Sequence, residues 1–291
     1  MRSCSKDARR ARPLLGTLAE VSVTGRAGAV DAAIAAAFAA LAEVERLMSF
    51  HDPASELALL NRDAHRHPVP VSAATHTVLA RALELARASD GAFDPCIAPA
   101  LQRLGFLPGP ADARGSSGWT QVELLPGPGV RFACPLALDL GGIAKGFAVD
   151  LAARALELHG IDDYCVNAGG DLRIGRVPRP VDVRHPAEPR ALVRLGEFAG
   201  VAVATSARYF TERGDGDGRV HPIIAPASGR PASYAGSISV IANDCIDADA
   251  LTKVVAVAGS RAAVVLERFA AEAWLLAESG AWSRLPVARA A

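Results

Sequence analysis

The chain has 291 residues, and 51% of them are hydrophobic, which is enough to bury a substantial core in one large domain or two modest ones. Lys plus Arg and Asp plus Glu number 31 each, so the charge balance favours neither nucleic acid nor an anionic membrane surface as a partner. The five cysteines are scattered without a Cys-x-x-Cys pair, which is typical of a reducing compartment and predicts a cytoplasmic protein without a disulfide framework or zinc site.

The first half of the chain begins with a basic segment and continues into strands and helices. Residues 1–12 are rich in Arg and lack the apolar stretch of a signal peptide, so we expect a disordered basic N-terminus. Alternating polarity predicts a strand at residues 18–23, and apolar residues at helical spacing predict helices at residues 30–48 and 73–88, the second capped by Ser72. A short strand is expected at residues 130–133. No run of about 18 apolar residues occurs, so no membrane span is predicted.

The second half mixes strands and helices without regular alternation. Helices are expected at residues 146–158, 249–257 and 260–269, and strands at residues 164–167, 181–184, 191–195, 200–205, 236–242 and 273–276, with a glycine-rich hairpin tip at residues 214–218. This order lacks the βαβ repeat of a doubly wound sheet, so the pattern favours an α+β fold. No linker is long enough to require a second domain.

The segment DLGGIAKG, residues 139–146, is the most informative motif. Adjacent glycines allow a ligand to approach the backbone, and the helix that follows offers unpaired N–H groups and a positive dipole end to an anion. Lys145 adds a mobile positive charge, and Asp139 adds a polar anchor. The segment suits a phosphate-bearing ligand, although a strand–turn–helix joint explains the glycines equally well, and neither known nucleotide-binding fingerprint is matched.

Three further segments combine polar residues with turns at the ends of predicted elements, where sites usually lie. His51 follows the first helix beside Phe50 and could stack on a planar ring; Asp94 follows an aromatic residue in a turn; and NAGGDLRIG, residues 167–175, is a second glycine turn. Ordinary capping and tight turns explain each of them separately. Two glycine turns so close in the sequence nevertheless predict two loops that converge on one ligand.

A fourth segment places Asp249 and Lys253 on a predicted helix. The two residues are spaced i, i+4 and could form an exposed ion pair, and the helix dipole alone would stabilise a carboxylate in the first turn. The neighbours Ile246 and Leu251 are apolar, which indicates that Asp249 faces inward, where a carboxylate needs a cation such as Mg²⁺. The residues leave both interpretations open.

Taken together and in this order, the segments resemble those of the FAD:protein FMN transferases, the ApbE-like family. The matching runs cover nearly the whole chain: LLGT (14–17), MSFHDPASELALLN (48–61), DGAFDP (90–95), LDLGGIAKGFAVD (138–150), VNAGGDLRIG (166–175), ATSARY (204–209), IIAPASGRP (223–231) and SISV with DADALTK (237–253). DLGGIAKGFAVD followed by NAGGDL is highly specific, and the other runs are weaker singly but collinear.

The resemblance implies a single compact α+β domain over residues 13–291, with mixed, mainly antiparallel sheets and packed helices. It implies a transferase that uses FAD as its substrate and Mg²⁺ as its metal, transfers FMN to a Thr or Ser hydroxyl of an acceptor flavoprotein, and releases AMP. Diphosphate chemistry of this kind depends on positioning and on charge stabilisation by cations.

The resemblance also assigns site residues position by position. The FAD contacts that it implies are Leu15, His51, Ala92, Phe93, Asp94, Asp139, Lys145 and Ile223, with His51 standing where the family usually has Tyr. Gly142 matches a backbone-carbonyl ligand of the metal, and Asp249 matches its carboxylate ligand.

The chain departs from the family pattern at two motifs. The family has His-Ile-Ile-Asp-Pro where this chain has Pro222-Ile223-Ile224-Ala225-Pro226, and His221, one position earlier, is the candidate for the catalytic histidine. A metal-binding Thr of the family corresponds to Lys253, while Thr252 points about 100° away on a helix. Lys253 is therefore a candidate both for catalysis and for the metal site: it either reaches a phosphate directly or excludes Mg²⁺.

Three activities follow from these matches and departures. An active FMN transferase is the first hypothesis. A catalytically impaired FAD-binding protein is the second, because of Ala225 and Lys253. An FAD pyrophosphatase that yields free FMN is the third.

Overall fold

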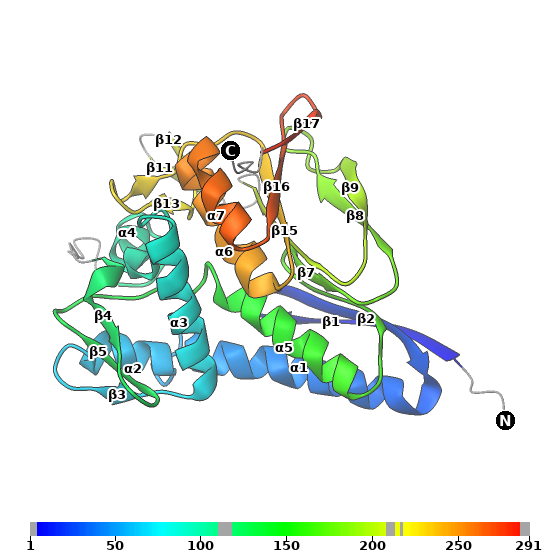
Figure 1. The fold of residues 1–291 in the computed structure, drawn as a ribbon, viewed down its shortest axis with the longest axis horizontal. Coiled ribbons are helices and arrows are strands. Elements are labelled where there is room, and N and C mark those ends of the chain that lie inside the picture. Colours follow the sequence, from blue (N-terminus) through cyan, green and yellow to red (C-terminus); the bar gives the residue numbers. More distant parts are fainter. Residues whose placement is uncertain (1–4, 110–117, 208–212, 216–217, 286–291) are drawn as a thin grey trace.

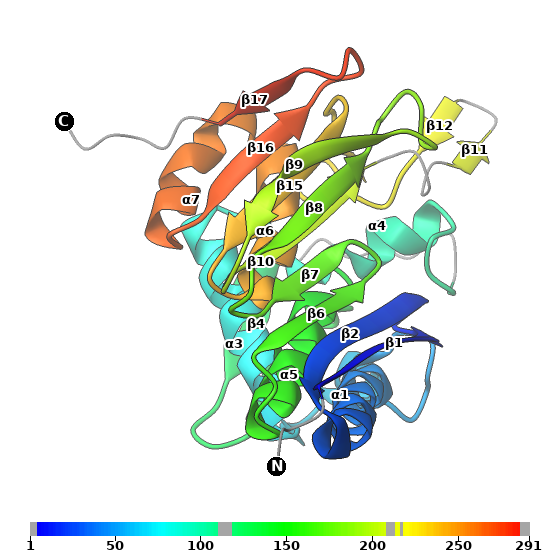
Figure 2. The same ribbon diagram turned by 90° about the vertical axis from the view of Figure 1, so that its right-hand side faces the viewer.

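One antiparallel sheet of eight strands organises the part of the chain that the computed structural model describes, residues 5–109, 118–207, 213–215 and 218–285 (Figure 2). Its strands, in spatial order, are β1 (Ser5–Leu14), β2 (Thr17–Arg26), β6 (Asp163–Ala168), β7 (Asp171–Ile174), β10 (Ala202–Ala207), β15 (Ser237–Ala242), β16 (Glu272–Leu276) and β17 (Trp282–Arg284). Every neighbouring pair is antiparallel. The predicted α+β class with mainly antiparallel pairing is confirmed.

Three helices pack side by side on this sheet (Figures 1 and 2): α1 (Ala27–Met48), α5 (Ala144–Leu158) and α6 (Cys245–Ala258). α1 contacts β2 and α5, and α6 contacts α5, β10 and β15. The helices are rich in alanine, and small side chains allow helix axes to approach closely. The apolar stripe expected on the first helix, with Ile34, Phe38, Leu41 and Val44, is buried in this layer.

Among the described helices, α1 is long and apolar enough to cross a membrane by length and composition alone. The cores of other proteins and signal sequences contain helices that meet the same criterion. In this structure the buried side of α1 packs against β2 and α5. The absence of a membrane span therefore stays a prediction.

A helical lobe follows α1 in the chain and lies beside the sheet (Figure 1). It consists of α2 (Glu56–Asp63), α3 (Ala73–Ala88), α4 (Ala98–Arg103), the 3₁₀ turns η1 (Pro95–Ile97) and η2 (Trp119–Gln121), and a small sheet of β3 (Val69–Pro70), β5 (Gly129–Phe132) and β4 (Val122–Leu124). Ser72 caps α3 as predicted, because its Oγ accepts a hydrogen bond from the Thr75 N–H at 3.2 Å.

Short hairpins and a second C-terminal helix complete the fold. They are β8 (Arg179–Arg184) with β9 (Leu192–Phe198), β11 (Arg213–Asp215) with β12 (Gly218–Val220), β13 (Ile224–Ala225) with β14 (Arg230–Pro231), and η3 (Gly259–Ala262) leading into α7 (Ala263–Arg268). The helix expected at residues 260–269 is thus divided into a 3₁₀ turn and an α-helix. The predicted tip at residues 214–218 joins β11 and β12, and its residues 216–217 lie outside the described part of the chain.

The expectation of a disordered N-terminus is wrong for residues 5–12. These residues belong to β1, which pairs with β2 from Ser5 opposite Arg26 to Leu14 opposite Thr17. β1 is an edge strand, and its basic residues suit that position because charged side chains discourage pairing with other chains. Two of them form ion pairs, Lys6 with Asp31 and Arg9 with Glu20. Residues 1–4 lie outside the described part of the chain.

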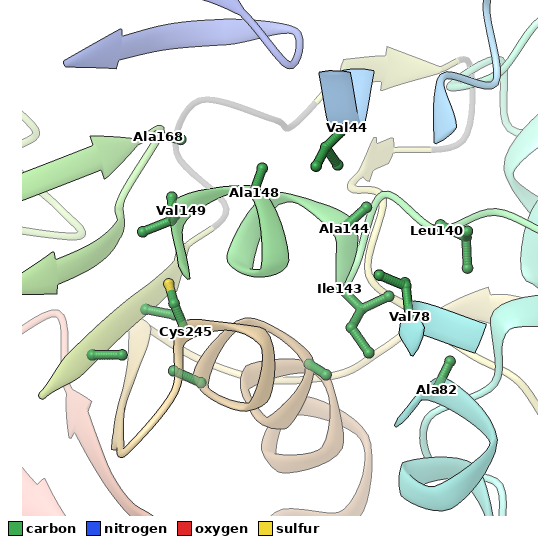
Figure 3. Close-up of a cluster of buried hydrophobic side chains, with 14 of the residues drawn as sticks. Val44, Val78, Ala82, Leu140, Ile143, Ala144, Ala148, Val149, Ala168 and Cys245 are labelled. Atoms are coloured by element: carbon green, nitrogen blue, oxygen red, sulfur yellow. The ribbon is translucent and has the colours of Figure 1, made fainter. Parts of the chain in front are cut away.

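The start of α5 is the centre of the hydrophobic core (Figure 3). Side chains from four directions meet there: Val44 of α1, Val78 and Ala82 of α3, Cys245 of α6, and Leu140 and Ile143 of the segment before α5. All six are at most 1% exposed. The segment 139–146 is therefore held on a rigid base, which fixes the polar groups on its other side.

Candidate active site

A cavity of about 680 Å³ opens where the helical lobe meets the sheet and α5. This volume lies within the usual range for small-molecule sites. The cavity is lined by most of the residues expected to contact FAD or a metal: Leu15, His51, Ala92, Phe93, Asp94, Asp139, Gly142, Lys145, Ile223 and Lys253. Asp249 lies beneath Lys145 and Lys253, and His221 is not part of the lining.

The two glycine loops converge on this cavity, as the sequence predicted. The first contributes Asp139, Gly141, Gly142 and Lys145, and the second contributes Gly169 and Asp171. Lys145 joins the loops, because its Nζ lies 3.0 Å from Asp171 Oδ2. Gly169 has a φ of +64°, and a Cβ there would lie 2.7 Å from Thr17 Oγ1, so the second loop needs glycine on both grounds.

Asp249 is placed by reciprocal capping between α5 and α6. Its Oδ2 accepts the Gly146 N–H in the first turn of α5 at 3.1 Å. In return, Asp150 of α5 accepts the N–H groups of Cys245 and Ile246 at the start of α6, both at 2.9 Å. Each helix thus supplies a carboxylate to the orphan N–H groups and positive dipole end of the other. The arrangement holds Asp249 rigidly at the floor of the cavity.

Asp249, Asp171, Lys145 and Lys253 form a buried charge cluster. Asp249 is 0% exposed and Asp171 is 4% exposed. Burial opposes ionisation of Asp249, but the ammonium groups of Lys145 and Lys253 lower its pKa below the usual range. Burial raises the pKa of Asp171, and the nearby Asp249 charge adds to this effect. Burial also opposes the charge on Lys145, but Asp171 and Asp249 raise its pKa above the ordinary value.

Asp139 connects the first glycine loop to the turn that carries Asp94. The backbone N–H of Asp139 donates to the carbonyl oxygen of Pro95 at 2.7 Å. Burial raises the pKa of the Asp139 carboxyl, although the Gly141 N–H and Lys145 favour its charged form. The Asp94 carboxylate accepts the N–H groups of Cys96 at 2.8 Å and Trp119 at 3.2 Å. Asp94 therefore shapes the wall of the cavity, whereas the Asp139 carboxylate is available to a ligand.

Leu15 enters the cavity from the tip of the β1–β2 hairpin. Leu15 and Gly16 form the two-residue turn with φ values of +58° and +68°, and positive φ at both central positions is the mark of a type I′ turn. The Leu15 N–H donates to Glu45 Oε1 at 2.8 Å, which anchors the strained turn to α1. A leucine with positive φ raises the free energy of the folded state, because its Cβ crowds the following carbonyl oxygen. The strained Leu15 lies on the cavity wall.

His221 does not face the cavity, so the structure gives no support to the catalytic role expected of it. Its ring is 3% exposed, with Nε2 at 2.9 Å from the Ala232 carbonyl oxygen and Nδ1 accepting the Ile223 N–H at 3.3 Å. The ring also packs edge-on against Tyr234. Pro222, at the position of the motif histidine, lines the cavity instead. The shift by one position thus gives His221 a structural role.

The i, i+4 pair of Asp249 and Lys253 forms, but at the cavity floor rather than on an exposed helix face. Lys253 Nζ bonds to Asp249 Oδ1 and lies 2.9 Å from the Asp249 carbonyl oxygen. Thr252 points away, as predicted: its Oγ1 donates to the Asp249 carbonyl oxygen and lies 2.7 Å from Ser206 Oγ. Thr252 is fully buried and is not part of the cavity lining.

The residues present do not fit a magnesium site. Mg²⁺ is usually held in a near-octahedral arrangement by one or two protein carboxylates together with waters and substrate phosphates, so at least one carboxylate oxygen must be free to bind it. Both carboxylate oxygens of Asp249 are already bound, Oδ1 by Lys253 and Oδ2 by Lys145 and the Gly146 N–H. Within the described residues, no group of three or more His, Cys, Asp and Glu side chains could hold a metal ion. Gly142 lines the cavity beside Lys253, whose Cε would lie 3.6 Å from a Cβ built on it.

Sequence reasoning did not assign Asp171 and Glu45 to the site. Asp171 ends the second glycine turn, and this motif could have indicated that Asp171 belongs to the site. Its ion pair with Lys145 could not be predicted, because the two residues are 26 positions apart in the sequence. Glu45 lies on the polar side of α1 and gave no signal, because its role depends on the hairpin tip that packs over it.

Comparison with known proteins places the chain in a family. The ApbE family profile matches residues 15–275. The chain belongs to the ApbE family. It is 32% identical over 297 residues to the FAD:protein FMN transferase of Treponema pallidum, covering 89% of this chain and 81% of that relative. It is 30% identical to the FAD:protein FMN transferase of Vibrio cholerae, over 75% of this chain and 71% of that protein.

Solved ApbE structures share the whole fold. The ApbE protein of Thermotoga maritima superposes with a TM-score of 0.85 at 26% identity, covering 96% of this chain and 97% of that one. The flavin transferase ApbE of Vibrio cholerae gives a TM-score of 0.82 at 26% identity, covering 97% of each chain. The ApbE resemblance recognised from the motifs is thus confirmed over nearly the full length.

Proposed function

We propose that this ApbE protein is an FAD:protein FMN transferase. The observation that carries the proposal is the convergence of the two glycine loops, Lys145 and the N-terminus of α5 on one cavity. In the reaction, the acceptor hydroxyl oxygen forms a bond to the phosphorus of the FMN half. The bond from that phosphorus to the bridging oxygen breaks, AMP leaves with that oxygen, and the hydroxyl proton passes to solvent.

Two parts of the cavity lining match the two kinds of surface on FAD. The part at α5 combines Lys145, Lys253 and the backbone of Gly141 and Gly142, a set that suits a diphosphate because it offers positive charge and close backbone approach. Another part of the lining is apolar and suits a ring system; it is formed by the clustered side chains of Ile97, Leu101, Phe106, Leu107 and Ile224. Asp139, beside Gly141 in the first glycine loop, offers an acceptor for a hydroxyl or a ring N–H.

The acceptor in this proposal is a flavoprotein with an exposed Thr or Ser at its flavinylation site. We place the reaction in the cytoplasm, a prediction supported by Cys96, Cys134, Cys165 and Cys245, which are free of disulfides. Separation of cell fractions and detection of the protein by antibody test this location. Recovery of the protein outside the cytoplasmic fraction would contradict it.

Incubation of the protein with FAD and a Thr-containing acceptor domain tests the transfer. The expected products are a covalently flavinylated acceptor, seen by in-gel fluorescence and intact mass, and one AMP per flavin transferred. An acceptor whose Thr is replaced by Ala is the control and should stay unlabelled. Absence of labelling with and without Mg²⁺ would refute the transferase assignment.

A second candidate function is FAD binding without transfer. Pro222 at the position of the motif histidine favours it, because it removes a general base from the cavity wall. Tight FAD binding without AMP release would support this alternative. Release of AMP with free FMN, and no labelled acceptor, would instead indicate an FAD pyrophosphatase.

A further inference from the structure

The charge cluster at the cavity floor leaves no oxygen of Asp249 free for a metal. Lys253 Nζ bonds to Oδ1 and also to the Asp249 carbonyl oxygen at 2.9 Å. Lys145 Nζ lies 3.3 Å from Oδ2, which the Gly146 N–H also contacts at 3.1 Å. Asp249 is completely buried, so these partners are also the reason that its charge is tolerated.

Lys145 also lies close to two neighbouring oxygens, of which Asp171 Oδ2 has this ion-pair contact but no hydrogen bond from the described residues. Lys145 Nζ lies 3.2 Å from the Gly141 carbonyl oxygen and 3.0 Å from Asp171 Oδ2. The cluster therefore holds two carboxylates and two ammonium groups, which balance in charge. A divalent cation would have to displace an ammonium group from the carboxylates before it could bind them.

Lys253 is packed in place and still reaches the cavity. Its stem lies beside Gly142, since a Cβ built on Gly142 would be 3.6 Å from Lys253 Cε. The Lys253 side chain is 20% exposed, and it lines the cavity. Its ammonium group is thus fixed on one side by Asp249 and open on the other side to an anion.

We propose that Lys253, with Lys145, takes the place of a divalent cation in this chain, so that its anionic ligand is bound without Mg²⁺. The identity of that ligand as FAD rests on the proposed function. The two ammonium groups donate charge-assisted hydrogen bonds to the diphosphate and to the bridging oxygen, on which negative charge develops during cleavage. Thr252 does not restore a metal site, because its hydroxyl already donates to the Asp249 carbonyl oxygen and lies 2.7 Å from Ser206 Oγ.

The first test measures metal binding by the flavin-free protein. Mn²⁺, titrated as a paramagnetic probe for Mg²⁺, should show no stoichiometric site in the wild type. The Lys253→Thr variant should gain one site, and adding Asp249→Asn to that variant should remove it. Lys253→Arg, which keeps the charge, should stay metal-free. Thermal melting of each variant shows that it is folded.

The second test measures FAD affinity by flavin fluorescence, after chelation and again with millimolar Mg²⁺. Wild-type affinity should change by less than about twofold, whereas Mg²⁺ should tighten FAD binding to Lys253→Thr by about tenfold, the effect of one charge-assisted contact.

Either of two metal results would overturn the proposal: one Mn²⁺ site in the wild type that Asp249→Asn removes, or no gain of metal binding in Lys253→Thr. Failure to bind FAD under every condition would instead refute the proposed function. The Mn²⁺ titration does not depend on FAD, so the two failures are distinguishable.

Discussion

Replacing Gly146 with alanine tests the close contact between α5 and α6 that holds Asp249. A Cβ at this position would lie 2.2 Å from the Cys245 carbonyl oxygen and 2.9 Å from Asp249 Cβ. The oxygen belongs to the backbone of α6 and cannot move by itself. To remove the clash, α5 and α6 must therefore separate by about 1 Å. Overpacking of this kind lowers the free energy of unfolding by about 1–3 kcal/mol. The higher helix propensity of alanine offsets up to about 1 kcal/mol of this loss.

We therefore expect Gly146→Ala to lower the free energy of unfolding by about 2 kcal/mol, which is roughly a thirtyfold change in the ratio of folded to unfolded protein. Urea unfolding followed by circular dichroism measures it. Gly28→Ala is the matched control, because Gly28 also lies in the first turn of a helix, α1, and has no atom within 4 Å of a built Cβ. Because alanine has a higher helix propensity than glycine and no clash arises at residue 28, this control should be stabilised by up to about 1 kcal/mol.

Gly146→Ala should also weaken FAD binding, because separation of α5 and α6 lengthens the hydrogen bond from the Gly146 N–H to Asp249 Oδ2. Affinity in the Gly28→Ala control should be unchanged. Equal stability of the two alanine variants would show that α5 and α6 do not approach as described. That result would also remove the basis for a rigidly held Asp249.

Three other substitutions test the site and its support. Burial raises the pKa of Asp150 to about 7, so between about pH 4 and pH 7 the folded state binds more protons than the unfolded state and stability falls as pH rises. Asp150→Asn should flatten this slope in urea unfolding across that range, and an unchanged slope would contradict the assignment. Asp139→Asn should weaken FAD binding about tenfold or more in a fluorescence titration, because it removes a charged hydrogen-bond acceptor; unchanged affinity would mean that the loop is only structural. Leu15→Asn should raise the unfolding free energy by about 1 kcal/mol, since Asn tolerates positive φ, yet should weaken FAD binding through lost apolar contact. Leu15→Asn with lower stability and full affinity would refute the role given to that strained turn.

The sequence by itself determined the local elements and the family. Periodicity and capping located α1, α3 and the central strands because these signals depend only on near neighbours. The two glycine loops, taken together with the other collinear motifs, identified the ApbE resemblance. Ten of the twelve residues assigned to the site line the cavity, since most of them belong to those collinear motifs.

The tertiary structure alone decided which side chains meet. Residues 5–12 form a strand because β2 supplies their hydrogen-bond partners, which no pattern within a basic, weakly apolar segment could predict. The direction of His221 depends on partners at Ala232 and Tyr234, and the charge cluster joins three segments that are far apart in the sequence. The sequence offered the Asp249–Lys253 pair, but only the packing of α5 on α6 places that pair at the cavity floor and brings Lys145 and the Gly146 N–H to the second carboxylate oxygen.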